Sequence, residues 1–246
     1  MILTHGGNLG DILSALPVCR QLHREGKPVD LRLITNIPQD HLPGSRLSQR
    51  TAEQLLPLLN AQHYLRSAEI YTGEPIDMML DSFRLEASLV DTRASQLCLW
   101  HAFATGVEID ITEPWLQVPV YDESYEDTIV TCFTPRYRQN LDWHLDDFKT
   151  LKLGLLSEGA DYECRDFLEA AIIIRSCQGF LSNACGLWWI AEGLKKQPRV
   201  QEVCSVSPMT FGVGAHCYHV MHQKFVEKGI DKLFMRHQRP VYKWNK

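Results

Sequence analysis

The start of the chain combines three local patterns that together allow few folds. A short apolar run, Ile2 to His5, leads into a glycine-rich segment, Gly6 to Asp11. Apolar residues then recur at helical spacing as far as Leu22, and a second apolar run covers 29–35. This order predicts a strand, a loop, a helix and a second strand, and strands joined in this way lie parallel with a right-handed crossover. The chain is therefore predicted to be an α/β protein.

Pro17 lies inside this predicted helix and limits where the helix begins. If Ser14 is the cap, Pro17 falls in the first turn, where it removes no bonded amide. If Asp11 is the cap, the helix carries a kink at Pro17. Both starts stay open, and Gly26 is expected to end the helix.

The alternation of strands and helices continues to about residue 203. In the first half we expect helices over 52–59 and 95–105 and strands over 68–71 and 76–80. In the second half we expect strands over 128–133, 179–181 and 199–203, helices over 166–175 and 187–194, and a loop over 182–186. The acidic, polar stretch 121–127 marks the boundary between them. The prediction is two Rossmann-like domains facing across a cleft, over residues 1–120 and 121–223, followed by a basic tail over 224–246.

Composition excludes several classes of protein. With 25 Lys and Arg against 30 Asp and Glu, the net charge of −5 disfavours a general nucleic-acid binder. No apolar stretch reaches the roughly 18 residues of a membrane-spanning helix, and the first residues do not resemble a secretory signal. The eight cysteines contain no C-x-x-C pair, which indicates reduced thiols and a cytoplasmic protein.

The glycine-rich loop is not a dinucleotide fingerprint. Gly6, Gly7 and Gly10 do not have the G-x-G-x-x-G spacing, and no acidic residue follows the second predicted strand. The loop nevertheless places backbone amides and Asp11 at the carboxyl edge of a parallel sheet, where ligands of open α/β sheets bind. The simpler interpretation, that Asp11 only caps a helix, stays open.

Four segments, in order along the chain, resemble one enzyme family. They are GNLGDILSALP over 7–17, LLPLLNAQHY over 55–64, TPRYRQN over 134–140, and GFLSN over 179–183 running into WIAEGL over 189–194. Together they resemble the ADP-heptose:lipopolysaccharide heptosyltransferase-like glycosyltransferases, a family 9-like group. The resemblance touches both halves of the chain.

The resemblance implies a GT-B fold, with the acceptor on the N-terminal side and the nucleotide-sugar on the C-terminal side. It implies an inverting, metal-independent glycosyltransferase without a cofactor. Such an enzyme moves a sugar from a nucleotide-diphosphate sugar to a glycan or glycolipid acceptor. Asp11 matches the family's general base toward the acceptor hydroxyl. The neighbouring residues Gly7, Asn8, Leu9 and Gly10 are then expected at the cleft.

The donor side needs groups that stabilise a departing diphosphate. The helix that starts near Leu187 offers free amides and a favourable dipole. Two arginines lie two residues apart after a strand, so we expect them to share a face and bind phosphate. Glu192 is a candidate partner for ribose hydroxyls. The donor candidates are Arg136, Arg138, Ser182, Asn183, Gly186 and Glu192.

Each donor candidate also has a simpler explanation. The arginines could be solvated or paired with local carboxylates, for which Asp142, Asp146 and Asp147 are available. Ser182 and Asn183 could only cap the helix, and Glu192 could face solvent. The pair Trp188-Trp189 on an apolar helix indicates a core position rather than a base-stacking platform.

Two features near the carboxyl terminus have less specific patterns. Histidines at 216, 219 and 222, beside Cys217, lack the i, i+4 spacing of a helical metal site, which favours a polar helix face and no metal. Residues 224–246 carry seven positive and two negative side chains. The favoured interpretation is a last helix that packs back across the cleft, and the alternative is peripheral contact with an anionic membrane.

The second half is short for this family. Only 27 residues separate Arg138 from Asp166, where relatives carry a further strand–helix unit and a glycine-rich turn. Residues 153–158 are the candidate remnant of that turn. The sequence therefore predicts a shortened donor domain and leaves a second hypothesis, a non-catalytic relative that binds a nucleotide-sugar or glycan.

Overall fold

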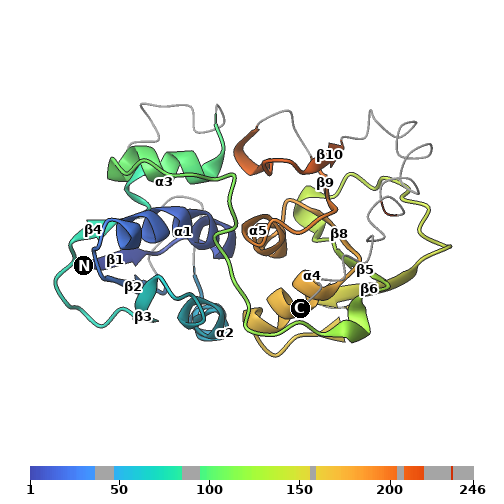
Figure 1. Cartoon of the computed structure of the whole chain (residues 1–246), viewed down its shortest axis with the longest axis horizontal. Helices are drawn as coiled ribbons and strands as arrows, with labels where there is room; N and C mark the ends of the chain where they lie inside the picture. The colour runs from blue at the N-terminus through green and yellow to red at the C-terminus, as the bar shows by residue number, and fades with distance from the viewer. Residues whose placement is uncertain (37–46, 85–94, 156–158, 204–207, 219–233, 235–246) are drawn as a thin grey trace, which may run out of the picture.

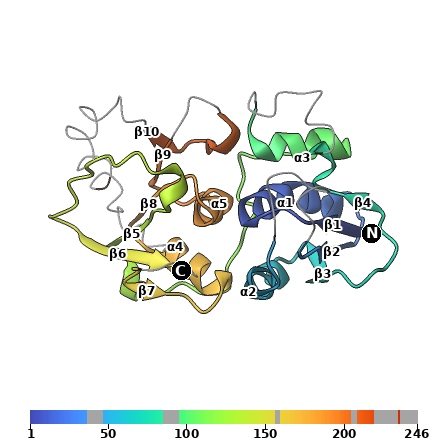
Figure 2. The same ribbon diagram turned by 180° about the vertical axis from the view of Figure 1, so that it is seen from behind.

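The computed structural model describes residues 1–36, 47–84, 95–155, 159–203, 208–218 and 234. Two parallel β-sheets lie toward opposite ends of the molecule, and helices fill the space between them (Figure 1). Each helix pair at the centre joins the two halves, because α1 packs on α5 and α2 packs on α4. Figure 2 shows the same layers from behind. The predicted α/β architecture with two facing halves is confirmed.

The N-terminal half contains a four-stranded parallel sheet in the order β3-β2-β1-β4. Its elements are β1 (Ile2–His5), α1 (Leu9–Arg24), β2 (Val29–Leu33), α2 (Gln49–Asn60), β3 (Leu65–Ile70), β4 (Met78–Met79) and α3 (Leu97–Thr105). Each was expected within a few residues of these bounds. Gly26 and Gly106 adopt the positive φ typical of helix ends, as the sequence predicts.

Helix α1 begins earlier than either predicted start. Asn8 is its cap: the Asn8 side chain accepts a hydrogen bond from the Asp11 amide at 3.2 Å, and the Asp11 carboxylate accepts one from the Asn8 amide at 3.1 Å. This reciprocal capping box satisfies two free amides, and burial of the apolar face of α1 adds to it, so the helix tolerates an interior proline. Pro17 has no N–H to donate to the carbonyl of Leu13, and the Trp115 indole donates to that carbonyl instead, at 3.0 Å.

The C-terminal half contains a six-stranded parallel sheet in the order β10-β9-β8-β5-β6-β7. Its elements are β5 (Thr128–Cys132), β6 (Lys149–Gly154), β7 (Tyr162–Glu163), α4 (Phe167–Ser176), β8 (Gly179–Asn183), α5 (Gly186–Gly193), β9 (Arg199–Glu202) and β10 (His216–Tyr218). The helices and strands β5, β8 and β9 were predicted, whereas the loop expected from residue 182 begins only after Asn183.

One prediction for this half is wrong, and one strand was not predicted. His216 lies on strand β10, paired with β9, and not on a polar helix face; His219 and His222 lie outside the described residues. Residues 149–154 form a strand that the sequence analysis did not expect. Of the basic tail over 224–246, only Phe234 is described, so the predicted last helix lies outside the described residues.

The connection from β5 to β6 explains why this half is short. Between residues 133 and 148 the chain forms only a 3₁₀ turn, Pro135–Tyr137, where a parallel crossover usually carries a helix. Residues from this connection cover the sheet face opposite α4 and α5. The buried apolar cluster there consists of Ile129, Leu141, Trp143, Leu181, Val200 and Phe234.

The segment that connects the halves is anchored in the core. Trp115 and the next residue, Leu116, both donate backbone hydrogen bonds to the carbonyl of Gly193 at the end of α5. The Tyr64 hydroxyl donates to the carbonyl of Trp115 at 2.7 Å. One buried cluster runs through both halves along this contact. Within the described ranges, none of the helices has the length and apolarity needed to cross a membrane.

Candidate functional site

The loop after β1 touches the start of α5 across the boundary between the two halves. Gly10 lies against Trp189, so that a Cβ at position 10 would be 2.7 Å from the Trp189 Cδ1. Gly186, the first residue of α5, lies against Leu9, whose side chain occupies the place of a Cβ. Two glycines of the predicted site are thus required by close packing. The contact brings the predicted acceptor and donor regions together.

Asp11 lies in the first turn of α1, at the carboxyl end of β1. Its side chain is 5% exposed, and it forms an ion pair with Arg84 in addition to the capping box with Asn8. The simpler interpretation, a helix cap, is therefore confirmed as one role of Asp11. Gly7 lies beside this carboxylate, because a Cβ there would be 2.9 Å from the Asp11 Oδ2.

A buried polar network holds the backbone of the loop that follows β1. The His5 Nδ1 accepts a hydrogen bond from the Gly7 amide at 2.9 Å, and the Asp81 Oδ2 accepts one from the Gly6 amide at 3.0 Å. The Asp81 Oδ2 also lies 3.7 Å from the His5 Nδ1. These bonds fix the backbone of the glycine-rich segment just before Asp11.

A second histidine completes the network. The His101 Nε2 lies 3.2 Å from the Ser14 hydroxyl, which donates to the Asp11 carbonyl at 2.8 Å. Burial lowers the pKa of His5 and lowers the pKa of His101 to about 3. Both imidazoles are therefore neutral near pH 7, and the charges of the network belong to the carboxylates and Arg84.

On the donor side, α5 begins without a side-chain cap. Its N-cap residue is Cys185, so neither Ser182 nor Asn183 caps the helix as one interpretation expected. The Asn183 amide instead holds the end of β8 to the end of β5, donating to the Thr134 carbonyl at 2.6 Å and accepting from the Thr134 amide at 3.1 Å. Ser182 is buried on strand β8.

A thiol pair lies next to this helix end. Seven cysteines lie in the described ranges and all are free, as predicted. The Cys185 Sγ lies 3.8 Å from the Cys132 Sγ. The hydrogen bond between them lowers the pKa of Cys185 and raises that of Cys132.

The arginines after β5 do not have the geometry of a strand. Pro135–Tyr137 is a 3₁₀ turn, so alternation along an extended chain does not place Arg136 and Arg138 on one face. The Arg136 side chain lies outside the described residues. Arg138 packs over the Phe133 ring, 3.5 Å from its centroid, and its Nε lies 3.7 Å from the Glu202 carboxylate. The carboxylate beside Arg138 is therefore Glu202, which is distant from it in the sequence.

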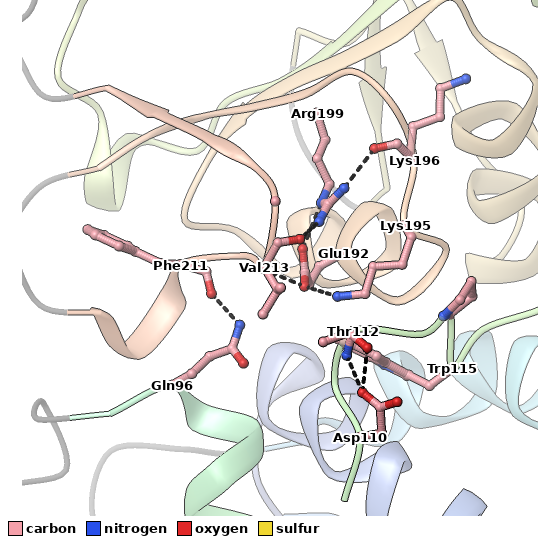
Figure 3. Close-up of polar contacts among 12 residues, drawn as sticks. Gln96, Asp110, Thr112, Trp115, Glu192, Lys195, Lys196, Arg199, Phe211 and Val213 are labelled. Atoms are coloured by element: carbon pink, nitrogen blue, oxygen red, sulfur yellow. Dashed lines mark hydrogen bonds and ion pairs between the residues drawn. The ribbon is translucent and has the colours of Figure 1, made fainter.

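Glu192 is fully buried, so the expectation that it faces solvent is wrong. Its carboxylate pairs with Lys195, lies 2.7 Å from the Arg199 Nε, and accepts a hydrogen bond from the Val213 amide at 3.0 Å (Figure 3). It belongs to the last turn of α5, about 9 Å along the helix axis from Gly186. In this position it fixes the segment before β10 rather than the start of α5.

The same segment reaches the N-terminal half. The Gln96 side chain, at the start of α3, donates to the Phe211 carbonyl (Figure 3). The Trp188 indole donates to the Thr210 carbonyl at 2.9 Å. Trp188 and Trp189 are both buried, which confirms their predicted core position.

Comparison with known proteins finds similarity in structure alone. The sequence matches no protein-family profile and no curated protein. The glycosyl transferase family 9 protein from Veillonella parvula superposes with a TM-score of 0.62 at 10% identity, over 96% of this chain and 97% of that one. E. coli heptosyltransferase WaaC with ADP superposes with a TM-score of 0.61 at 9% identity, over 94% of this chain and 98% of WaaC.

A third solved structure is TibC, an iron-containing dodecameric glycosyltransferase from enterotoxigenic E. coli. It gives a TM-score of 0.56 at 15% identity, over 87% of this chain and 61% of TibC. This chain therefore spans about three fifths of the length of TibC. The fold is GT-B-like. The likeness to these glycosyltransferases confirms the predicted fold class.

Within this GT-B-like fold, several residues near the predicted site were not found from the sequence. They are Asp81, Arg84 and His101 around Asp11, and Glu202 beside Arg138. Asp81 lies two residues after β4 and directly after the predicted strand 76–80, and the end of a predicted parallel strand was the signal that could have identified it. Among the described residues, no group of three or more His, Cys, Asp or Glu side chains is arranged to hold a metal ion.

Proposed function

We propose that this protein is a glycosyltransferase that moves a sugar from a nucleotide-diphosphate sugar to a hydroxyl acceptor, with inversion and without a metal. One observation carries the proposal: Asp11 and the free start of α5 lie at a single junction, where Leu9 packs on Gly186. A carboxylate and a helix N-terminus are the two groups that such a transfer requires.

In the proposed reaction, the acceptor hydroxyl attacks the anomeric carbon while Asp11 takes the hydroxyl proton. The bond from the anomeric carbon to the diphosphate oxygen breaks, and the diphosphate leaves with that electron pair toward the first amides of α5. These amides and the helix dipole stabilise the developing negative charge. Arg84, paired with Asp11, holds the carboxylate in place.

Similar structures suggest which donor to test first. E. coli WaaC was solved with ADP and with ADP-2-deoxy-2-fluoro heptose, and TibC with ADP-D-β-D-heptose. ADP-heptose is therefore the first donor in our proposal, with a glycan or glycolipid as acceptor. The roles proposed for Arg138, Ser182, Asn183 and Glu192 in donor binding stay predictions.

The test is a transfer assay over ADP-, UDP- and GDP-sugars with a panel of glycan acceptors, combined with calorimetric titration of the nucleoside diphosphates. We expect binding of one nucleotide, turnover with inverted product configuration by NMR, and unchanged turnover in EDTA. Asp11→Asn should remove turnover and retain nucleotide binding. The matched control is Asp166→Asn, which keeps a good cap on α4 far from the junction. Absence of nucleotide binding, or full activity of Asp11→Asn, would contradict the proposal.

A second candidate is a non-catalytic relative that binds a nucleotide-sugar or glycan. The observation that favours it is the small accessible surface of Asp11, whose carboxylate is already paired with Arg84 and Asn8. Nucleotide binding without turnover across the acceptor panel would select this candidate. A cytoplasmic location and membrane contact through residues 224–246 also stay predictions; sedimentation of the full chain with anionic vesicles tests the membrane contact.

A further inference from the structure

A pocket of about 490 Å³ lies on the face of the C-terminal sheet opposite α4 and α5. Its floor includes Thr131 of β5 and Thr150 of β6, which project from the same face of the sheet. Its walls come from the irregular connection between these strands and include Arg138, Trp143 and Phe148. The volume is within the range of small-molecule sites. Between residues 133 and 148, where a crossover helix usually covers such a face, the chain forms only a 3₁₀ turn, and the pocket lies beside this connection.

The walls are held in place by one buried carboxylate. Glu202, at the end of β9, accepts hydrogen bonds from the amide of Gln139 at 2.9 Å, the amide of Leu141 at 3.3 Å and the indole of Trp143 at 2.8 Å. An irregular segment of this kind would otherwise lack partners for its backbone. The pocket is thus a fixed feature of the fold, built by contacts between segments about 60 residues apart.

The Arg138 guanidinium makes few polar contacts with the described residues. It stacks on Phe133 and lies 3.7 Å from Glu202, and it donates no hydrogen bond to the residues that the structure describes. Its Nη1 is buried and has no hydrogen-bond partner in the described part of the chain, whereas 27% of the side chain is exposed, so other N–H donors are accessible from the pocket. A ligand with oxygen acceptors would satisfy those that line the pocket.

The charges of the pocket determine what such a ligand is. Against the single positive charge of Arg138 stand the negative charges of Asp146, which lines the pocket, and of Glu202 behind the wall. This balance disfavours phosphates and carboxylates. Arg138 offers donors, Asp146 offers acceptors, and the two threonine hydroxyls offer both. The rings of Trp143 and Phe148 add apolar surface.

We infer that this pocket is a binding site for a neutral sugar residue, separate from the junction at Asp11. Hydroxyl groups of the sugar bind to Arg138, Asp146 and the threonines, and its C–H surface packs on the aromatic rings. The site does not depend on the proposed transfer reaction. In a glycosyltransferase it would hold a part of a glycan remote from the reacting hydroxyl.

The experiment is saturation-transfer difference NMR on the full chain with methyl glycosides of glucose, galactose, mannose and N-acetylglucosamine, and calorimetric titration with inorganic phosphate for comparison. At least one glycoside should bind, and more tightly than phosphate. Asp146→Asn should weaken binding about tenfold and Thr150→Val about threefold, because each removes hydrogen bonds to the sugar. Both residues are exposed, so these variants are expected to fold.

The matched control is Asp147→Asn, an exposed neighbour that does not line the pocket and should leave binding unchanged. Binding should also persist in Asp11→Asn, which separates this site from the proposed reaction. It should persist under saturating ADP as well, because the inference excludes the predicted role of Arg138 in binding the donor. The inference would be overturned if no glycoside bound, if phosphate bound more tightly than the glycosides, or if ADP competed with them. Wild-type affinity in both Asp146→Asn and Thr150→Val would also overturn it.

Discussion

Asp11 and Glu192 are both buried carboxylates in segments that resemble the same family, yet they occupy opposite ends of their helices. Asp11 lies in the first turn of α1, at the carboxyl edge of its sheet, and pairs with Arg84. Glu192 lies in the last turn of α5, at the other edge of its sheet, between two cations and an amide. Ligands of α/β folds bind at the carboxyl edge, so position along the helix separates a candidate for chemistry from a residue that holds the structure together.

The largest expected effect is on the rate of transfer in Asp11→Asn. If Asp11 is the general base, kcat should fall about 10²–10⁴-fold, because the amide cannot accept the proton. The free energy of unfolding should fall by only about 1–3 kcal/mol, from weaker bonds to Arg84 and Asn8. Initial-rate kinetics and urea denaturation of the same samples measure both quantities. A variant that loses stability and keeps its rate would make Asp11 a cap alone.

The reverse pattern is expected for Glu192→Gln. Removal of this charge leaves Arg199 and Lys195 without their buried counter-ion, which should lower the free energy of unfolding by about 3–5 kcal/mol. The fraction that remains folded should retain its nucleotide affinity, as measured by denaturation and calorimetry. A selective loss of affinity with unchanged stability would instead support the predicted contact with ribose.

A smaller effect is expected at the contact between the halves. Gly186→Ala places a methyl group against Leu9 and should cost about 1–3 kcal/mol through overpacking. Leu9→Ala in the same chain makes room for that methyl group, so the cost of the double variant should be less than the sum of the single costs. Thermal or urea denaturation of the four proteins measures this coupling. Strict additivity would show that the two residues do not touch in solution.

The smallest expected effect is on the pH dependence of stability, through the buried histidines near Asp11. The pKa of His101 is about 3 in the folded protein and near 6.5 when unfolded, so the unfolded chain binds more protons below pH 6.5. This contribution to stability is complete above pH 6.5 and is lost as the pH falls toward 3. His101 adds a slope of at most about 1.4 kcal/mol per pH unit, and buried His5 acts in the same direction.

Urea denaturation between pH 7.5 and 5 measures this slope. His101→Gln should reduce it, whereas His23→Gln, on the exposed end of α1, should leave it unchanged. An identical slope in the wild type and His101→Gln would mean that His101 is accessible to protons in the folded state.

The fold was predictable where burial imposes a local pattern. Strands such as β1, β5 and β8 are buried along most of their length and carry adjacent apolar residues at their centres or starts. Strand β6 was missed because Lys149, Thr150 and Lys152 interrupt its apolar residues, and β10 because its three residues depend on pairing with β9. The start of α1 was misplaced because Pro17 favours a later start, whereas the capping box of Asn8 and Asp11 begins the helix before it.

The candidate site was predictable only in part. Asp11 stands in a local motif, but Arg84 reaches it from 73 positions away, and no periodicity in the sequence connects them. Glu202 stands as a charged residue in a predicted strand. Its partners over 139–143 have an irregular backbone, so no sequence periodicity predicts their contact with Glu202. Such contacts depend on the packing of whole elements, which single-sequence patterns do not specify.

The helices α1, α2, α4 and α5 form a shared inner layer, in which each half covers the apolar surface of the other. Neither half can be cut away without exposing that layer to water, so the chain should melt in one cooperative step. The same dependence restricts evolution: recombination that exchanged one half for that of a distant homologue would have to preserve the Leu9–Gly186 contact. Changes of specificity are therefore expected in the loops, while the two halves are inherited together.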